Sequence, residues 1–176
     1  MIFTETELGG AFIIDLEQRE DDRGFFARSW DENEFRDHDL NPRIVQCNVS
    51  FNHHAGTLRG MHFQNAPHAE AKLIRCTMGA ILDVIIDLRP DSPTFKRWIG
   101  VELTAENRRS LYVPEGFAHG YQTLADGTET FYQVSEFYAP GVEGGVRWDD
   151  PVFAIEWPRE VTVISPKDAS WPDFAE

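Results

Sequence analysis

The stretch GTLRGMHFQ, residues 56–64, places an arginine and a histidine inside what otherwise reads as a short apolar strand. A neutral imidazole is a good proton acceptor near neutral pH, and a guanidinium group binds anions. Side chains alternate between the two faces of a strand, so Arg59 and His62 fall on opposite faces. One face must be the interior, and we therefore predict that at least one of these polar groups points inward.

A lone histidine in a strand is more often structural than catalytic, but a nearby lysine strengthens the case for chemistry. In AKLIRCTM, residues 71–78, Lys72 shares a face with Ile74 and Cys76. If that face is the interior, the lysine is buried, which costs free energy unless the side chain is paired or functional. The alternative is that Lys72 precedes the strand and reaches solvent along its aliphatic stem.

The segment VPEGFAHGYQ, residues 113–122, contributes a further histidine, His119. Its Pro-x-Gly-x-x-His spacing resembles the second half of the signature of cupins, which are small jelly-roll barrels. Metal-binding cupins carry His-x-His in the first half, whereas this chain has His62-Phe63-Gln64. A tight metal site needs three or four ligands. We therefore predict a cupin-like barrel that uses no metal and no cofactor.

Residues of these types can perform acid–base chemistry without a metal. A histidine can abstract a proton if a carboxylate fixes its tautomer, a tyrosine can act as the acid, and a lysine can stabilise an oxyanion. Together they suit the removal of a proton from a carbon next to a carbonyl group. The residues alone do not identify the carboxylate or the tyrosine.

The elements that must position these side chains read as short strands. Apolar residues recur at every second position in runs that are separated by Gly, Pro and Asp, which is typical of an antiparallel sandwich or barrel. The runs span residues 71–78, 80–88, 97–103, 108–114 and 128–138. Closure into a barrel would protect the strand edges. We predict an all-β, cupin-type jelly-roll barrel that forms a single domain over residues 1–176.

Three local details complete this prediction. In the run AILDVIIDL, residues 80–88, the apolar positions from Leu82 to Leu88 share one face, while Asp83 and Asp87 lie on the other. DENEFRDHDL, residues 31–40, reads as a short flanking helix that opens with Asp31 as its N-cap. The tail from residue 163 contains too many prolines for regular structure.

Composition excludes several classes of function. The 176 residues carry a formal net charge of −14, so non-specific binding of nucleic acid is not expected. No apolar run approaches the roughly 20 residues that span a bilayer, and no signal peptide is visible. The two cysteines, Cys47 and Cys76, have the spacing of ordinary reduced thiols. We expect a cytoplasmic protein that has no membrane partner.

A series of blocks along the chain resembles the dTDP-4-dehydrorhamnose 3,5-epimerase family of nucleotide-sugar epimerases. The blocks occur in the family's order and cover nearly the whole chain: RGFF (23–26), QCNVS (46–50), GTLRGMHFQ (56–64), AKLIRC (71–76), residues 83–109, VPEGFAHG (113–120), GVRWDDP (145–151) and ISPKD (164–168). The resemblance implies a jelly-roll homodimer and a cofactor-independent reaction. The implied substrate is a nucleoside diphosphate-linked 4-keto-6-deoxyhexose, whose ketone acidifies the C–H bonds at C3 and C5.

The resemblance also assigns roles to residues. His62 corresponds to the base, Asp168 to its carboxylate partner, Lys72 to the group that stabilises the enolate, and Tyr132 to the acid on the opposite face. The implied substrate-binding residues are Arg23 and Arg59 at the phosphates, Phe26 and Arg28 in the same block as Arg23, Gln46, Asn48 and His119 in the pocket, and Tyr138 as an aromatic near the base.

Three positions depart from the common pattern of the family. Members have a glutamate where this chain has Arg28, and thymine N3 carries a hydrogen that suits a carboxylate, whereas cytosine N3 accepts a hydrogen bond from an arginine. This difference raises a CDP-linked sugar as an alternative to a dTDP-linked one, unless Arg28 only contacts phosphate or solvent. Val49 and Gln133 replace a histidine and a lysine, which leaves open whether C3, C5 or both are inverted.

Other functions remain as alternatives at this point. A ketoisomerase that moves the carbonyl between C3 and C4 would use similar histidine chemistry. A metal-dependent cupin enzyme is disfavoured by the missing His-x-His. A non-catalytic sugar-binding cupin would have no need of a base, an acid and an enolate stabiliser together.

Overall fold

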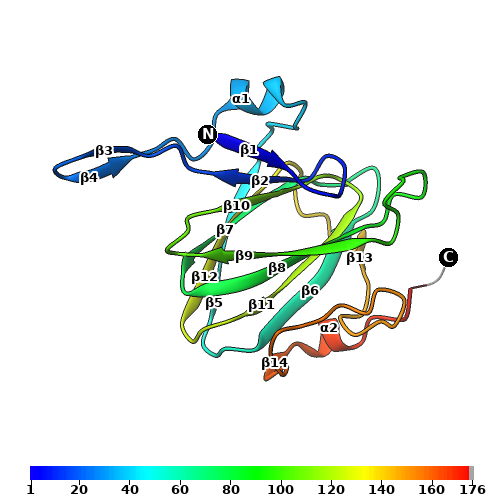
Figure 1. Ribbon diagram of the computed structural model, residues 1–176. Coiled ribbons are helices and arrows are strands. Elements are labelled where there is room, and N and C mark those ends of the chain that lie inside the picture. Colours follow the sequence, from blue (N-terminus) through cyan, green and yellow to red (C-terminus); the bar gives the residue numbers. More distant parts are fainter. Residues whose placement is uncertain (175–176) are drawn as a thin grey trace.

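Two antiparallel sheets face each other in the computed structural model, which describes residues 1–174 (Figure 1). The first sheet has the order β1 (Ile2–Glu5), β2 (Phe12–Asp15), β10 (Ser110–Val113), β7 (Lys72–Met78), β12 (Thr128–Val134), β5 (Gln46–Asn52). The second has the order β13 (Glu143–Gly145), β6 (Thr57–Gln64), β11 (Phe117–Thr123), β8 (Ala80–Asp87), β9 (Trp98–Thr104). This architecture confirms the predicted all-β jelly roll.

A separate hairpin extends from the barrel. It consists of β3 (Arg19–Asp21) and β4 (Gly24–Phe26), which pair only with each other (Figure 1). The strands of the barrel, by contrast, are hydrogen-bonded to neighbours within the two large sheets. For example, β2 pairs with β10, and Ile13 lies opposite Leu111. The hairpin is therefore not part of either sheet of the barrel.

The interior between the two sheets has an apolar half and a polar half. The apolar half is a cluster contributed chiefly by β7 to β11, which contains Leu8, Ala11, Ile74, Cys76, Ile81, Ile85, Val101, Leu103, Leu111, Val113, Phe117 and Tyr121. Each large side chain buried in this way contributes on the order of 1.5–3 kcal/mol relative to an exposed one. This cluster holds the sheets together and leaves the other half, toward β5 and β6, free to form a cavity.

The strand β8 is covered on both faces, which its sequence pattern did not indicate. Ile81 and Ile85 point into the core between the sheets. Val84 and Ile86, on the other face, pack under a layer formed by the C-terminal segment, including Phe153. The aspartates at 83 and 87 are on the interior side and are fully buried. The predicted alternation is correct, but neither face is exposed to solvent.

The short helices are α1 (Glu32–Asp37) and α2 (Pro166–Ala169). The first confirms the prediction, because the Asp31 side chain accepts hydrogen bonds from the backbone N–H groups of Asn33 and Glu34. Neither helix, within residues 1–174, is long and apolar enough to cross a membrane. Both cysteines are free thiols, as predicted.

The prediction that the tail lacks regular structure was wrong. The strand β14 (Val163–Ile164) pairs in parallel with Thr57 and Leu58 of β6, and α2 follows it directly. Pro166 occupies the first turn of α2, where a missing N–H group costs nothing, and Ser165 caps the helix by accepting from the N–H of Asp168. A proline at this position favours a helix start rather than preventing one.

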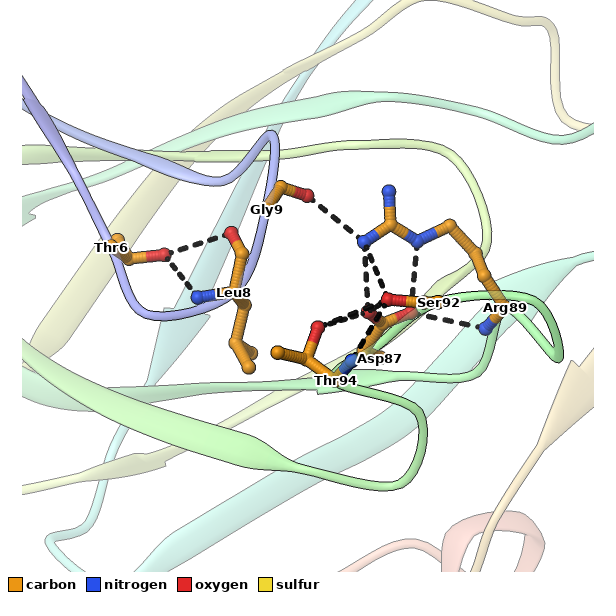
Figure 2. A network of polar contacts seen from close by, with 7 residues as sticks. All are labelled: Thr6, Leu8, Gly9, Asp87, Arg89, Ser92 and Thr94. Atoms are coloured by element: carbon orange, nitrogen blue, oxygen red, sulfur yellow. Dashed lines mark hydrogen bonds and ion pairs between the residues drawn. The ribbon is translucent and has the colours of Figure 1, made fainter.

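A buried carboxylate ties the turn after β8 to the loop between β1 and β2 (Figure 2). Asp87 accepts hydrogen bonds from Arg89 Nη2 at 2.7 Å, from Ser92 Oγ at 2.5 Å and from Thr94 Oγ1 at 2.7 Å. Arg89 in turn donates to the carbonyl of Gly9 at 2.9 Å. Burial alone would raise the pKa of Asp87, but these hydrogen bonds lower it to about 2.

This network predicts a specific loss of stability in acid. The folded-state pKa lies below the ordinary value of 3.8, so the contribution of Asp87 is complete above about pH 4 and is lost as the pH falls toward 2. We expect Asp87→Asn to have a lower free energy of unfolding than wild type at pH 5. This difference between the two proteins should become smaller by about 2 kcal/mol when the pH is lowered to 2. Denaturant unfolding across this range measures it.

Asp91→Asn is the matched control, because Asp91 lies on the same turn and is exposed. It should keep the acid dependence of wild type. If the free energies of unfolding of Asp87→Asn and wild type differ by the same amount at every pH, the low pKa assigned to Asp87 is contradicted.

Candidate active site

The polar half of the interior is a cavity of about 590 Å³ that opens between the two sheets. Its walls come from β5, β6, β7, β11 and β12, together with residues 163–168. Nine of the twelve residues that the sequence assigned to catalysis or binding line this cavity: Gln46, Asn48, Arg59, His62, Lys72, His119, Tyr132, Tyr138 and Asp168. The sequence had separated these residues by more than a hundred positions.

Arg59 and His62 both reach the cavity because β6 has a bulge between them. Arg59 pairs with Tyr121 of β11 and His62 pairs with His119, so two residues of β6 stand opposite one residue of β11. The extra residue reverses the alternation of side chains. The prediction that at least one group points inward is confirmed, but the two groups share a face, contrary to the simple parity rule.

Glycine is required where the strands cross at this bulge. Gly60 has a φ of +133°, and a Cβ on it would lie 2.5 Å from the Cα of Gly120 on β11. Larger residues therefore fit neither the backbone conformation nor the space. Met61, the other residue of the bulge, is fully buried in the outer layer beside Val84. The local sequence Arg-Gly-Met-His thus places both polar groups on the cavity side.

His62 and Asp168 form a hydrogen-bonded pair. Nε2 of His62 lies 2.7 Å from Oδ1 of Asp168, and the backbone N–H of Gly60 donates to Oδ2 at 3.2 Å. Burial would raise the pKa of Asp168, but the hydrogen bonds from His62 and Gly60 lower it below its ordinary value. The carboxylate is therefore ionised and fixes the imidazole through Nε2, which leaves Nδ1 as the nitrogen that can take a proton.

Tyr132 lies on β12 of the first sheet, whereas His62 lies on β6 of the second. The two residues therefore approach the cavity from opposite sheets. Burial raises the pKa of the Tyr132 phenol above its ordinary value of 10, and the neighbouring Tyr121 and Glu70 raise it further. The phenol is protonated at neutral pH, so one wall of the cavity has an imidazole and the opposite wall has a phenol that can donate a proton.

Lys72 is buried at the start of β7 and lines the cavity. This confirms the inward orientation and excludes the alternative in which the side chain reaches solvent. Its Nζ lies 3.1 Å from Oε1 of Glu70 and 3.5 Å from the carbonyl oxygen of His62. The ammonium group therefore lies near the backbone of His62, where it can stabilise a negative charge on an oxygen of a bound molecule.

A second histidine–carboxylate pair lies on the same sheet as His62. Nε2 of His119 is 2.7 Å from Oδ1 of Asp83, which is fully buried. The other oxygen, Oδ2 of Asp83, is buried without a hydrogen-bond partner among residues 1–174. The alternation in 80–88 had placed Asp83 opposite the apolar residues, and this pairing explains why a carboxylate is tolerated there.

Further polar groups line the mouth of the cavity. Arg59 donates from Nε to Oδ1 of Asn52 at 2.7 Å, which holds its guanidinium group at the rim. The Gln46 side chain accepts from the backbone N–H of Tyr138 at 2.8 Å. Lys167 forms an ion pair with Glu143 at the same rim.

Three predicted binding residues are not in the cavity of this chain. Arg23 and Phe26 lie on the β3–β4 hairpin, and Arg28 follows it (Figure 1). Arg23 is paired with Asp21, its neighbour on the same hairpin. Nη1 of Arg28 donates a hydrogen bond to Oδ2 of Asp31 at 2.9 Å. Asp31 is the residue whose carboxylate caps α1. Within one chain, both arginines are therefore engaged locally, whereas Phe26 is exposed.

Three charged cavity residues had no role in the sequence analysis: Glu70, Glu143 and Lys167. Two residues that contact the cavity histidines also had none: Asp83, which pairs with His119, and Trp171, whose ring centroid lies 6.4 Å from that of His62. Glu70 and Lys167 each adjoin a residue or block that had been singled out, but a single sequence does not show that a charged residue in a loop turns toward a cavity. Among residues 1–174, no cluster of three or more His, Cys, Asp or Glu side chains could hold a metal ion.

Comparisons with known proteins point to one family. Residues 5–176 match the family described as dTDP-4-dehydrorhamnose 3,5-epimerase. The protein of that name from Methanothermobacter thermautotrophicus is 42% identical over 177 residues, which cover 99% of this chain and 95% of the relative. A crystal structure of the Bacillus anthracis protein of that name, with TDP and PPi bound, has a TM-score of 0.94 at 44% identity and covers 98% of this chain and 99% of its own.

A second solved structure contains a nucleotide sugar. The Legionella pneumophila dTDP-6-deoxy-D-glucose-3,5-epimerase, in complex with dTDP-4-keto-L-rhamnose, has a TM-score of 0.89 at 35% identity. The alignment covers 97% of this chain and 90% of that one.

Proposed function

Because this chain belongs to the dTDP-4-dehydrorhamnose 3,5-epimerase family, we propose that its cavity binds a nucleoside diphosphate-linked 4-keto-6-deoxyhexose and that His62 and Tyr132 invert its ring carbons. The chain is an epimerase, which places it among the isomerases. The observation that carries the assignment of roles is the placement of a carboxylate-bound imidazole and a protonated phenol on opposite sheets of one cavity.

The first step removes a proton from a carbon next to the ketone. Nδ1 of His62 takes the proton, the electron pair of the C–H bond forms a C=C bond, and the carbonyl electrons move to the oxygen to give an enolate. Asp168 stabilises the imidazolium ion that results, because it is ionised and 2.7 Å from Nε2. Lys72 donates a hydrogen bond to the enolate oxygen.

The second step returns a proton from the other side. The Tyr132 hydroxyl donates to the carbon as the enolate collapses to the ketone, so the new C–H bond forms on the face opposite to the one that was broken. Imidazolium and phenolate then exchange protons with solvent, and both return to their starting states. No redox step is involved, and the product is an isomer of the substrate.

The comparisons favour a dTDP-linked substrate. The Bacillus anthracis structure contains TDP and the Legionella pneumophila structure contains a dTDP-linked 4-keto sugar. The argument for CDP came from Arg28 alone, and in this chain its guanidinium group contacts the capping carboxylate of α1. We therefore propose dTDP as the preferred nucleotide and keep CDP as the alternative.

A homodimer would bring the missing binding residues to the site. The hairpin exposes Phe25 and Phe26, the latter with 66% of its surface accessible. Among residues 1–174, the edge strand β5 pairs only with β12, and it exposes Val49 and Phe51 on the face opposite to its cavity-lining residues. Exposed apolar groups of this kind mark interaction sites. We propose that the hairpin of a second copy supplies Arg23 and Phe26 to this cavity. A cytoplasmic location and a single domain stay predictions.

The reaction can be tested in D2O with the dTDP-linked 4-keto-6-deoxyglucose. Wild type should introduce deuterium at C3, C5 or both, which NMR locates. His62→Ala should reduce the rate roughly 10²–10⁴-fold because the base is lost. Asp168→Asn should reduce it by a similar factor, since the imidazole loses the carboxylate that fixes its tautomer.

Tyr132→Phe provides the control that separates base from acid. This variant should still introduce deuterium at the carbon next to the ketone, because the base remains. It should invert that carbon more slowly, because the proton donor on the opposite face is missing. Failure of wild type to exchange any carbon-bound proton would overturn the proposed function. A product with the ketone moved to C3 would instead identify a ketoisomerase.

The nucleotide preference can be measured by calorimetric titration with dTDP and with CDP. We expect tighter binding of dTDP. Tighter binding of CDP would establish the alternative, and Arg28→Glu would then be expected to reverse the order.

The shared site can be tested by complementation. His62→Ala chains and chains with Arg23→Ala and Phe26→Ala should each be weakly active alone. When they are co-expressed and mix at random, about a quarter of the wild-type exchange rate should return, because half of the dimers contain one intact site out of two. A monomer by sedimentation, or no recovery on mixing, would contradict a hairpin that acts across the interface.

A further inference from the structure

Among residues 1–174, Glu70 is the cavity residue whose carboxylate pairs with the lysine that the proposed mechanism uses. Its side chain is only 13% exposed, although it lies in the loop before β7. Oε1 lies 3.1 Å from Nζ of Lys72, which is itself 9% exposed. A buried carboxylate is costly unless it has a function or a partner, and here the partner is a proposed catalytic group.

Other contacts hold the Glu70 carboxylate in this place. Gln64 donates from Nε2 to Oε2 of Glu70 at 3.3 Å. The orientation of that amide is fixed, because its Oε1 accepts from the backbone N–H of Ala139 at 2.8 Å. Nε2 of Gln64 also lies 3.1 Å from the carbonyl of His68. The carboxylate is therefore bound on both oxygens, one to an amide and one to an ammonium group.

The remaining carboxylates around the cavity are paired elsewhere. Asp168 is bound to His62, Glu143 to Lys167, and the buried Asp83 to His119. The titratable groups that line the cavity besides Glu70 and Lys72 are Arg59, His62, His119, Tyr121, Tyr132, Tyr138, Glu143, Lys167 and Asp168. Glu70 is thus the anion that remains to balance Lys72.

We propose that Glu70 is a positioning residue of the epimerase, whose negative charge holds the Lys72 side chain in place with one of its N–H groups directed at the enolate oxygen. An ammonium group has three donors. One points to Glu70 at 3.1 Å, and a second reaches the carbonyl of His62 at 3.5 Å. The third is left for the cavity. The inference rests on the proposed function, since it concerns the oxygen that this reaction charges.

The same carboxylate acts on the acid of the reaction. Glu70 is among the groups that raise the pKa of Tyr132, after burial and Tyr121. Removing its charge would make it easier for the Tyr132 phenol to lose a proton. This change shifts the alkaline limit of activity to lower pH.

The substitution Glu70→Gln tests the proposal, because it removes the charge but keeps the size and an acceptor for Gln64. Deuterium exchange into the dTDP-linked 4-keto sugar is measured from pH 6 to pH 11. We expect rates within a few-fold of wild type near neutral pH and an alkaline limb that begins at a lower pH than in wild type. An unchanged limb would overturn the proposal and leave Glu70 as a tether for its loop.

Glu7→Gln is the matched control. Glu7 forms an ion pair with Arg97 on the surface, with both side chains more than half exposed. This variant should keep the wild-type pH profile. If wild type itself shows no exchange at any pH, the proposed function fails, which is a different result from an unshifted limb in an active enzyme.

A stability measurement tests the pair without relying on activity. Lys72→Met leaves the Glu70 carboxylate buried without its cation, and this should lower the melting temperature by about 3 °C or more. Adding Glu70→Gln to Lys72→Met should recover most of that loss, while Glu7→Gln should recover none. If the changes in melting temperature caused by Lys72→Met and Glu70→Gln simply add in the double variant, Glu70 does not act through Lys72.

Discussion

The site depends on a single carboxylate that joins the C-terminal turn to the bulged strand. Oδ1 of Asp168 binds the imidazole of His62, and Oδ2 accepts the backbone N–H of Gly60. The outer edge of β6 is otherwise shared between β14, which pairs with Thr57 and Leu58, and β13, which pairs from His62 onward. The carboxylate thus accepts a hydrogen bond from the Gly60 N–H group at the point where neither β13 nor β14 pairs with β6. Its other oxygen orients the imidazole of His62.

This arrangement makes the base dependent on distant parts of the chain. The short strand β14 sets the position of α2, and the Ser165 cap presents Asp168 to β6. Trp171, just beyond α2, packs against Gly145 and stands edge-on to the imidazole. A defect anywhere in this C-terminal layer would move the carboxylate relative to Nε2, so the layer that covers the outer face of the second sheet also determines the geometry of the proton acceptor.

The sequence was sufficient for the sheets but not for the way in which they bring the side chains together. Alternating runs predicted strands such as β7 and β8, because period 2 is a local property of the chain. The same rule gave an inward Lys72 as one of two alternatives, and the structure shows that this one is correct. The rule failed between Arg59 and His62, since a bulge depends on how β6 pairs with β11 and not on β6 alone. Asp168 came only from the family resemblance. As a carboxylate in a proline-rich tail it has no local signal, and its role arises from contacts more than a hundred residues away.

The division of the barrel interior explains how a strongly acidic protein can stabilise an anionic intermediate. The apolar cluster between β7 and β11 provides the cohesion of the two sheets, so the half toward β5 and β6 can bury charge. There each carboxylate at the cavity faces a cation or an imidazole: Asp168 with His62, Glu70 with Lys72 and Glu143 with Lys167. Negative charge is thereby balanced in pairs, and a new negative charge on a bound ketone oxygen meets N–H donors rather than unpaired carboxylates. Because His62 and Tyr132, the proposed base and acid, come from different sheets, the barrel holds them on the opposite faces of attack that an inversion requires.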